Sequence, residues 1–399
     1  MHRALFSRPR GLPRQELIEA ALALKPLLEK NGAEADRLRR LPEDNVRALA
    51  DAGLWKAQTP RRFNGFEVPL ATKMECSAAL AMGCASTSWV FFIINICHWA
   101  ASLYPDRAQR EVWGQNPDAR VCGVLPPWSK TKAVTGGLEV TGKWAFASGC
   151  SHADWAVLGI PVVDKDGKTV DEGLALIPRT EWSIEDTWHV AGMRGTGSNT
   201  IVANEVFVPS HRILSMSRAI QGDYATEHKD EICYRTSLFP QFAIELAGPQ
   251  MGIGRAALQY VAEKASVRGV TYTKYEKQTQ SVAHHMGIAE ASMLVDGASL
   301  HAHRAVNEIW SAAERGEKME YVMRAKVRGD TGWSIRQVQQ ALDKLLTLHG
   351  TSSFGEWNPL QRWWRDANVA SRHAVADPML NLEVYGNALL GAEPITPLV

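Results

Sequence analysis

The pattern of the chain changes twice along its length, and this change limits the fold more than any other feature of the sequence. Residues 15–114 and 232–375 carry apolar side chains at helical spacing, whereas residues 119–214 form short alternating runs interrupted by glycine and proline. A chain of 399 residues is long enough for about two to three domains. The sequence therefore predicts a helical domain at 1–118, a β-domain at 119–215 and a helical bundle at 216–399.

Local signals place individual elements within these parts. Residues 135–142, 155–160, 173–178 and 200–209 are predicted to be strands, and residues 164–168 form a hairpin tip. Leu17 to Leu28 are predicted to lie on one helix, and a second helix starts with Pro42 in its first turn and stops at Gly53. Residues 393–399 are expected to be a flexible or interface tail.

Residues 77–104 contain no charged side chain and are long enough to cross a membrane. They also contain Ser86, Asn95 and His98, and polar groups of this kind are costly in lipid, so we expect a central helix of a protein without a membrane span. The first ten residues lack the apolar core of a signal peptide, and the six cysteines lack disulfide or metal spacing. We therefore expect reduced thiols and a cytoplasmic protein.

Composition and spacing exclude several other functions. Lys and Arg total 44 against 43 Asp and Glu, without a basic run, so we expect no nucleic-acid partner. His284 with His285, and His301 with His303, point to different faces of a helix, so we expect no metal site. No GxGxxG motif follows a predicted strand, which leaves no fingerprint for a nicotinamide cofactor.

The segment GMRGTGS at residues 192–198 sets three glycines around two hydroxyl side chains. It is too short for a helix of its own, and glycines of this kind let the backbone approach another group closely. We expect that group to be a planar cofactor with polar edges.

Four motifs together resemble a known family. They are GCASTSWV at 83–90, WAFASGCSHADW at 144–155, GMRGTGS, and NPLQR followed by an ArgAsp pair within 358–366. In this order they are similar to the acyl-CoA dehydrogenase fold, and within it to the two-component flavin-dependent monooxygenases, such as the oxygenases of p-hydroxyphenylacetate and dibenzothiophene. The resemblance covers residues 17–386. It implies a mainly α fold with a β-barrel middle domain, a C-terminal four-helix bundle and a homotetramer.

The positions of the catalytic base separate dehydrogenases from oxygenases in this resemblance. In most dehydrogenases a glutamate lies eight residues after the ArgAsp pair, where this chain has Ala374. In another branch it lies eight residues before a proline, where this chain has Gln241, with Glu245 one turn further on. The resemblance therefore favours an oxygenase. An acyl-CoA dehydrogenase with a displaced base, an N- or S-oxygenase on the same fold, and an inactive scaffold stay open as alternatives.

The resemblance implies a complete chemistry for the oxygenase. A separate reductase supplies reduced FAD or FMN, O₂ reacts to a C4a-hydroperoxyflavin, and one oxygen atom goes to a small aromatic or polycyclic substrate of phenol or indole type. His373 would donate a proton near the flavin, and Ser148 would bond flavin N5. His98 would polarise the substrate. A histidine facing solvent at a helix end and a histidine bonded in the core are the simpler interpretations of His373 and His98.

The remaining site residues are assigned from the same motifs. The alternation of Trp144, Phe146 and Ser148 would also fit one face of a strand, and the hydroxyls near Arg194 would also fit a stabilised turn. The resemblance assigns the cofactor to Trp144, Phe146, Ser148, Arg194, Gly195, Thr196 and Ser198, and the substrate to Trp89, Asn95 and Trp128.

Overall fold

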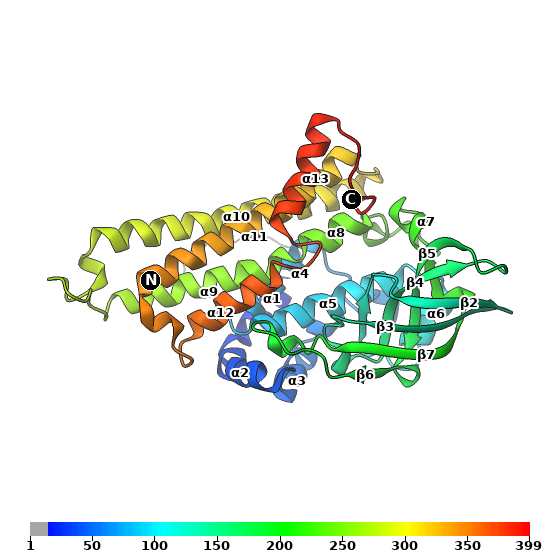
Figure 1. The fold of residues 1–399 in the computed structure, drawn as a ribbon, viewed down its shortest axis with the longest axis horizontal. Helices are drawn as coiled ribbons and strands as arrows, with labels where there is room; N and C mark the ends of the chain where they lie inside the picture. The colour runs from blue at the N-terminus through cyan, green and yellow to red at the C-terminus, as the bar shows by residue number, and fades with distance from the viewer. Residues whose placement is uncertain (1–14) are drawn as a thin grey trace.

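The computed structural model describes residues 15–399 and has the expected order of helices, strands and helices (Figure 1). The expectation about a signal peptide concerns residues outside this range. The first part contains six α-helices: α1 (Gln15–Ala23), α2 (Lys25–Leu38), α3 (Glu43–Asp51), α4 (Leu70–Ala81), α5 (Ala85–Ser102) and α6 (Asp106–Trp113).

Two segments that the sequence analysis treated as single helices are each divided in the structure. The face from Leu17 to Leu28 belongs to α1 and α2, because Pro26 in the first turn of α2 cannot continue the hydrogen bonds of α1. Residues 77–104 belong to α4 and α5, which separate at Met82–Cys84. A Cβ atom at Gly83 would lie 2.7 Å from the Cβ of Leu28, so the break lets α2 approach closely. In the part of the chain that the structure describes, no helix has the length and apolarity to cross a membrane.

The helix predicted at Pro42 is confirmed as α3. Pro42 is the residue before its first turn, and Gly53 follows its end with a positive φ of 69°.

The middle part forms two separate four-stranded sheets. One has the order β1-β4-β5-β8 and the other β2-β3-β7-β6. The pairing does not close them into a barrel, so the β-barrel expected from the resemblance is corrected to two sheets. The expected hairpin tip lies between β4 and β5. The strands are β1 (Val121–Val124), β2 (Ser129–Val134), β3 (Gly137–Trp144), β4 (Trp155–Val163), β5 (Thr169–Pro178), β6 (Ser183–Glu185), β7 (Thr200–Pro209) and β8 (Ile213–Ser215).

The C-terminal part is helical, and α9, α10, α11 and α12 run side by side away from the sheets (Figure 1). Its helices are α7 (Met216–Ile220), α8 (Leu238–Ile244), α9 (Ala247–Ala265), α10 (Val282–Arg315), α11 (Tyr321–His349), α12 (Pro359–Ala370) and α13 (Pro378–Leu390). α13 extends the helical region beyond the limit near residue 375 that the sequence pattern predicted.

The end of the tail that was expected to be flexible or an interface is held by α11. Arg328 Nη1 donates to the carbonyl of Leu398 at 2.5 Å, and Arg324 Nη1 donates to the backbone oxygen of Val399 at 2.7 Å. The Val399 side chain is buried.

Candidate active site

A row of hydrogen-bonded side chains joins α5 to the sheet domain. Trp89 Nε1 on α5 donates to Ser148 Oγ at 3.1 Å. Ser148 Oγ lies 2.7 Å from Ser198 Oγ, and Ser198 Oγ lies 2.7 Å from Thr196 Oγ1. Thr196 Oγ1 donates to the carbonyl of Met193 at 2.8 Å. Two motifs that are far apart in the sequence, at 144–155 and 192–198, therefore meet in one buried row.

His373 reaches the same place from the end of α12. Its ring centre lies 5.9 Å from that of Trp89, and the two rings meet edge to face. Its Nδ1 accepts the backbone N–H of Val375 at 3.3 Å, so the proton of the neutral ring is on Nε2. The His373 side chain is exposed just beyond α12, as the simpler interpretation of a solvent-facing histidine at a helix end has it. The protein around the ring, with a smaller effect of Arg328, still lowers its pKa.

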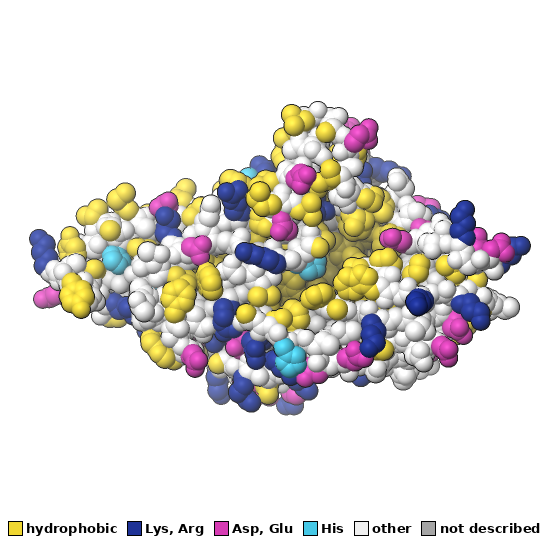
Figure 2. All heavy atoms as spheres, viewed as in Figure 1, with side chains coloured by type: hydrophobic (Ala, Val, Ile, Leu, Met, Phe, Trp, Pro, Cys, Tyr) yellow, Lys and Arg dark blue, Asp and Glu magenta, His cyan; other side chains and the backbone are white. Residues whose placement is uncertain are grey.

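The space-filling view shows a hollow between α13 and the sheet domain (Figure 2). Hydrophobic side chains line it, and a histidine side chain is visible within it. His373 belongs to the connection from α12 to α13. An apolar hollow with a few polar groups is the usual form of a small-molecule site.

The glycines of residues 192–198 approach the protein itself. A Cβ at Gly192 would lie 2.3 Å from the carbonyl oxygen of Arg365, and a Cβ at Gly195 would lie 2.9 Å from Ser86 Cβ. Gly197 has a positive φ of 55°. At Gly192 and Gly195 the close approach is therefore to neighbouring helices, and the expected approach to a cofactor stays a prediction.

Arg194 also binds the protein. Its Nε donates to the carbonyl of Asp36 at 2.9 Å, and its Nη1 donates to the carbonyl of Val190 at 2.9 Å. These bonds fix the loop on α2, which is the arrangement of a stabilised turn. A role of Arg194 toward a cofactor stays a prediction.

The ArgAsp pair at 365–366 holds the same loop from α12, a role that the sequence analysis missed. Asp366 Oδ1 accepts the backbone N–H of Met193 at 2.5 Å, and Arg365 Nη1 donates to the carbonyl of Ala191. Burial raises the pKa of Asp366 to about 6. Met193 has a positive φ of 53°, which is uncommon for a side chain of its kind, so this contact stabilises a costly backbone conformation.

The aromatic residues of the 144–155 motif separate into buried and exposed ones. Trp144 is fully buried and donates from Nε1 to the carbonyl of Gly159 at 2.8 Å, so it faces the interior of the sheets. β3 ends at Trp144, and Phe146 has a positive φ of 64° with 62% of its side chain exposed. The alternative that Trp144, Phe146 and Ser148 form one strand face is therefore wrong.

Trp128 lies beside Phe146. Their ring centres are 6.3 Å apart, and nearly half of the Trp128 side chain is exposed. Trp188 contacts the other side of Phe146 at 6.1 Å. Of the two rings proposed to cover a cofactor, only Phe146 presents an accessible face.

His98 and Asn95 lie elsewhere on α5. Nine residues separate His98 from Trp89, which is about 13 Å along a helix and nearly the opposite face. His98 Nδ1 bonds Thr59 Oγ1 at 2.8 Å, and among residues 15–399 its Nε2 has no hydrogen-bond partner. Burial, with smaller effects of Arg120 and Lys73, lowers its pKa to about 3. The structure therefore does not bring His98 to Ser148 and His373.

The amide of Asn95 is used within the protein. Its Nδ2 donates to the carbonyls of Leu54 and Phe91, and its Oδ1 accepts the backbone N–H of Gln58. The side chain is fully buried. These bonds hold the segment after α3 against α5, and contact with a substrate stays a prediction.

Glu245, the residue that could rescue a dehydrogenase, is paired with a lysine. Its Oε2 lies 2.6 Å from Lys73 Nζ, and both side chains are about 2% exposed. Burial raises the pKa of Glu245 and lowers that of Lys73. A carboxylate held in this way is poorly placed to remove a proton from a substrate.

Comparison with known proteins identifies the family. Residues 244–378 match the family described as acyl-CoA dehydrogenase, C-terminal domain. The oxygenase subunit HsaA of a flavin-dependent monooxygenase from Rhodococcus jostii is 34% identical over 376 residues, which cover 94% of this chain and 98% of HsaA. The chain belongs to the oxygenase components of flavin-dependent monooxygenases.

Two further relatives agree. The oxygenase component of an FADH₂-dependent resorcinol hydroxylase from Rhizobium is 31% identical over 96% of both chains. The solved structure of XiaF from Streptomyces, in complex with FADH₂ and glycerol, has a TM-score of 0.92 at 36% identity and covers 96% of this chain and 97% of XiaF. The family and fold that the four motifs predicted are thus confirmed.

The residues around Ser148 fit a reduced flavin. Ser148 Oγ accepts one hydrogen bond from Trp89 and keeps a second lone pair for a donor. Phe146 offers an exposed ring face, and His373 offers the N–H of Nε2. Together they supply an acceptor, a stacking surface and a donor, which match the edges and face of an isoalloxazine.

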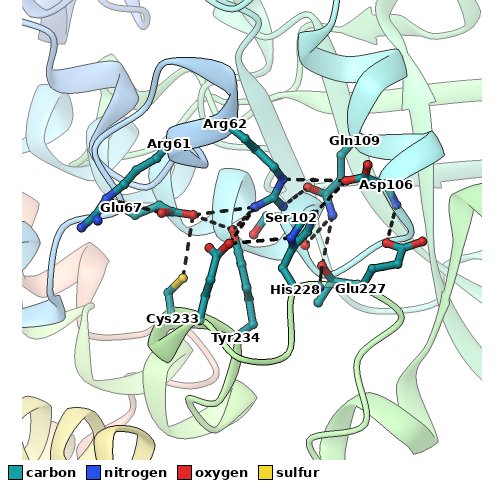
Figure 3. Close-up of polar contacts among 12 residues, drawn as sticks. Arg61, Arg62, Glu67, Ser102, Asp106, Gln109, Glu227, His228, Cys233 and Tyr234 are labelled. Atoms are coloured by element: carbon teal, nitrogen blue, oxygen red, sulfur yellow. Dashed lines mark hydrogen bonds and ion pairs between the residues drawn. The ribbon is translucent and has the colours of Figure 1, made fainter.

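A second polar cluster joins the N-terminal helices to residues 227–235 (Figure 3). The ligand atoms of Glu67, Glu231 and Cys233 lie within 4.8 Å of one another, a spacing that could hold a metal ion. Arg62 Nη1 lies 3.7 Å from Glu231 Oε1, and Tyr234 donates from its hydroxyl to Glu67 at 2.8 Å. Because Arg61 and Arg62 already pair with these two carboxylates, we interpret the cluster as a structural clasp.

Proposed function

We propose that this oxygenase component uses reduced flavin and O₂ to hydroxylate a small aromatic substrate in the hollow beside Trp89, Ser148 and His373. The observation that carries the proposal is that the row of Trp89 and Ser148 and the ring of His373 come from three distant segments and contact one another. Reduced flavin supplies two electrons, one atom of O₂ enters the substrate, and the other leaves as water.

The protein contributes binding and protonation to this reaction. Ser148 would hold the flavin edge through its free lone pair, and Phe146 would stack on the ring. His373 would donate a hydrogen bond from Nε2 to the reacting oxygen, and its Nδ1 bond to Val375 keeps Nε2 as the donor. The apolar walls would exclude water, so that less reduced flavin is oxidised to release hydrogen peroxide without forming product.

The aromatic substrate class is inferred from the lining and from the relatives. The hollow is apolar, and the resorcinol hydroxylase shares the fold over nearly the whole chain. We propose a phenol as the first substrate to test, and an indole as the second. In an alternative that keeps the same site, an amine or a sulfur atom would accept the oxygen.

The protein also needs partners. Since the sequence has no nicotinamide fingerprint, we propose that a separate cytoplasmic reductase delivers FADH₂ or FMNH₂ by diffusion. We also propose a homotetramer, because α10 exposes apolar side chains spaced four or seven residues apart along one stripe. They are Val282, Met286, Met293 and Leu300. A mass measured by light scattering equal to a monomer would contradict the tetramer.

Coupled turnover tests the proposed function. The enzyme is mixed without oxygen with chemically reduced FAD or FMN and a phenol, a diphenol or an indole, and air is then admitted. We expect a hydroxylated product and less hydrogen peroxide than free flavin gives. Oxidation of the flavin at its rate in solution, without product, would contradict the proposal. Bleaching of bound oxidised flavin by an acyl-CoA would instead favour the dehydrogenase.

A further inference from the structure

The hydrogen atoms of the row at Ser148 can be assigned one by one. The row contains three short oxygen contacts, Ser148–Ser198, Ser198–Thr196 and Thr196–Met193 C=O, each of 2.7 or 2.8 Å. Two oxygens at this distance need a hydrogen between them, and each hydroxyl has only one to give. The carbonyl of Met193 can only accept.

This fixes the direction of every bond. Thr196 must give its hydrogen to the Met193 carbonyl, so Ser198 must give its own to Thr196. Ser148 must then give its hydrogen to Ser198, and it receives the N–H of Trp89. The free position of Ser148 is therefore a lone pair, and Ser148 cannot donate to a ligand while the row is intact.

The end of the row is held in place by the backbone. The Met193 carbonyl also accepts the backbone N–H of Thr196 at 3.1 Å and Trp188 Nε1 at 3.0 Å. Its own N–H is bound by the buried Asp366. The row therefore cannot reverse by a turn of one hydroxyl, because reversal would leave a short oxygen contact without a hydrogen.

We infer that Ser198 and Thr196 are positioning residues that make Ser148 an acceptor only, and so select reduced over oxidised flavin. Position N5 of a reduced flavin carries an N–H, which Ser148 can accept. Position N5 of an oxidised flavin carries a lone pair, which would face the lone pair of Ser148. This inference rests on the proposed placement of flavin N5 at Ser148.

The two redox states of the flavin therefore differ in affinity, because the reduced form makes a hydrogen bond at N5 and the oxidised form meets a lone pair there. A hydrogen bond gained or left unmade changes affinity about 3- to 10-fold in each direction. The row would let the enzyme bind the flavin that the reductase delivers and release it after turnover. It would act through Ser148 without Ser198 or Thr196 touching the cofactor.

The test measures the dissociation constants of oxidised FAD and of FADH₂ under nitrogen and compares their ratio. Ser198→Ala removes the acceptor that takes the Ser148 hydrogen, so Ser148 becomes able to donate to oxidised N5. We expect the preference for FADH₂ to fall about 5- to 10-fold in this variant. Thr196→Val removes the acceptor of the Ser198 hydrogen, one step further from Ser148, and is expected to lower the preference for FADH₂ less.

Two controls keep the readout specific. Thr196→Ser retains the hydroxyl and should retain the preference of the unaltered enzyme. Thr200→Val removes a nearby buried hydroxyl that bonds Thr187 outside the row, and it should leave the ratio unchanged. General damage to the site weakens the binding of oxidised and reduced flavin together and does not change the ratio of the two dissociation constants.

The outcomes separate the inference from the proposed function. An unaltered enzyme that binds neither form of FAD or FMN contradicts the proposed function. An enzyme that prefers FADH₂ equally in its unaltered, Ser198→Ala and Thr196→Val forms overturns the inference and leaves the function standing. If one of these two variants does not fold, the other decides.

Discussion

At the scale of single residues, the site depends on which atoms donate and which accept. Ser148 is fixed as an acceptor by its neighbours, and His373 is fixed as an Nε2 donor by Val375. The lowered pKa of His373 favours its neutral ring at neutral pH in the absence of cofactor. It therefore offers a hydrogen bond at neutral pH, and a bound anionic flavin would raise its affinity for a further proton.

Without His373, reduced flavin should still react with O₂, but less of the oxygen should reach the substrate. We expect His373→Ala to give at least about tenfold less product per reduced flavin, with a matching rise in hydrogen peroxide, because a positioned acid group contributes this much or more. His373→Gln keeps an N–H donor and should recover part of the coupling. His285→Ala, which removes an exposed histidine on α10, is the control. Unchanged coupling in His373→Ala would refute its role.

His98 predicts a dependence of stability on pH. Its pKa is about 3 in the folded protein and about 6.5 when unfolded, so the unfolded chain takes up the proton first. Stability is therefore lost as the pH falls below about 6.5, by about 2 kcal/mol between pH 7 and pH 5. We expect urea unfolding of His98→Gln to show a correspondingly smaller loss, and His285→Gln to behave as the unaltered enzyme. An equal loss in His98→Gln would contradict the prediction.

At the scale of elements, the loop 190–198 takes its shape from helices that are distant in sequence. α2 holds Arg194, α5 packs on Gly195, and α12 holds Met193 through Asp366. The loop is thus a rigid support for the row at Ser148.

Asp366→Ala should disturb this support. It leaves the N–H of Met193 without a partner, so we expect about 1–3 kcal/mol less stability and weaker binding of reduced flavin. Asp366→Asn keeps an oxygen at Oδ1 and should lose less of both. Thermal unfolding and flavin titration measure the two effects. Flavin affinity equal to that of the unaltered enzyme in Asp366→Ala would show that the loop holds its shape without α12.

The clasp around Arg62 joins separate elements, and its removal should change the stability of the protein measurably (Figure 3). Without Arg62, Glu67, Glu231 and Asp106 lose the one cation that all three share, while Arg61 stays beside Glu67 and Arg110 stays beside Asp106. We expect Arg62→Met to lose about 1–3 kcal/mol of stability at pH 7. Burial and Glu67 raise the pKa of Glu231, so protonation relieves the repulsion and the loss should shrink toward pH 5. A loss that does not change with pH would contradict this interpretation.

The sequence predicted elements well where local patterns decide and less well where packing decides. The strands at 155–160 and 200–209 are short apolar or alternating runs bounded by other local signals, and they lie within β4 and β7. The break at Gly83 depends on contact with Leu28, and the hold of Arg328 on the C-terminal tail depends on α11. No local pattern contains such contacts.

The same limit applies to the candidate site. The motifs pointed to Ser148, Thr196 and Ser198, but only the structure shows that they form one row with Trp89. In the sequence Asp366 served only to locate the position of a dehydrogenase base, whereas in the structure its own side chain holds the loop. His98 was selected for its helix, and helical geometry already places it away from the Trp89 face.

At the scale of the whole molecule, the helices and sheets bring three segments together. α5 supplies Trp89, the sheet domain supplies Ser148, and the end of α12 supplies His373. No single domain contains the site, so its chemistry depends on the complete arrangement of the three parts (Figure 1).

The source of the oxygen in the product tests the central claim most directly. Reduced flavin, the enzyme and a phenol that it hydroxylates are mixed under ¹⁸O₂ in ordinary water, and the product is analysed by mass spectrometry. We predict one ¹⁸O atom in each molecule of hydroxylated product. A product that carries only oxygen from water would contradict the oxygenase reaction, because a dehydrogenase followed by hydration would then explain the product.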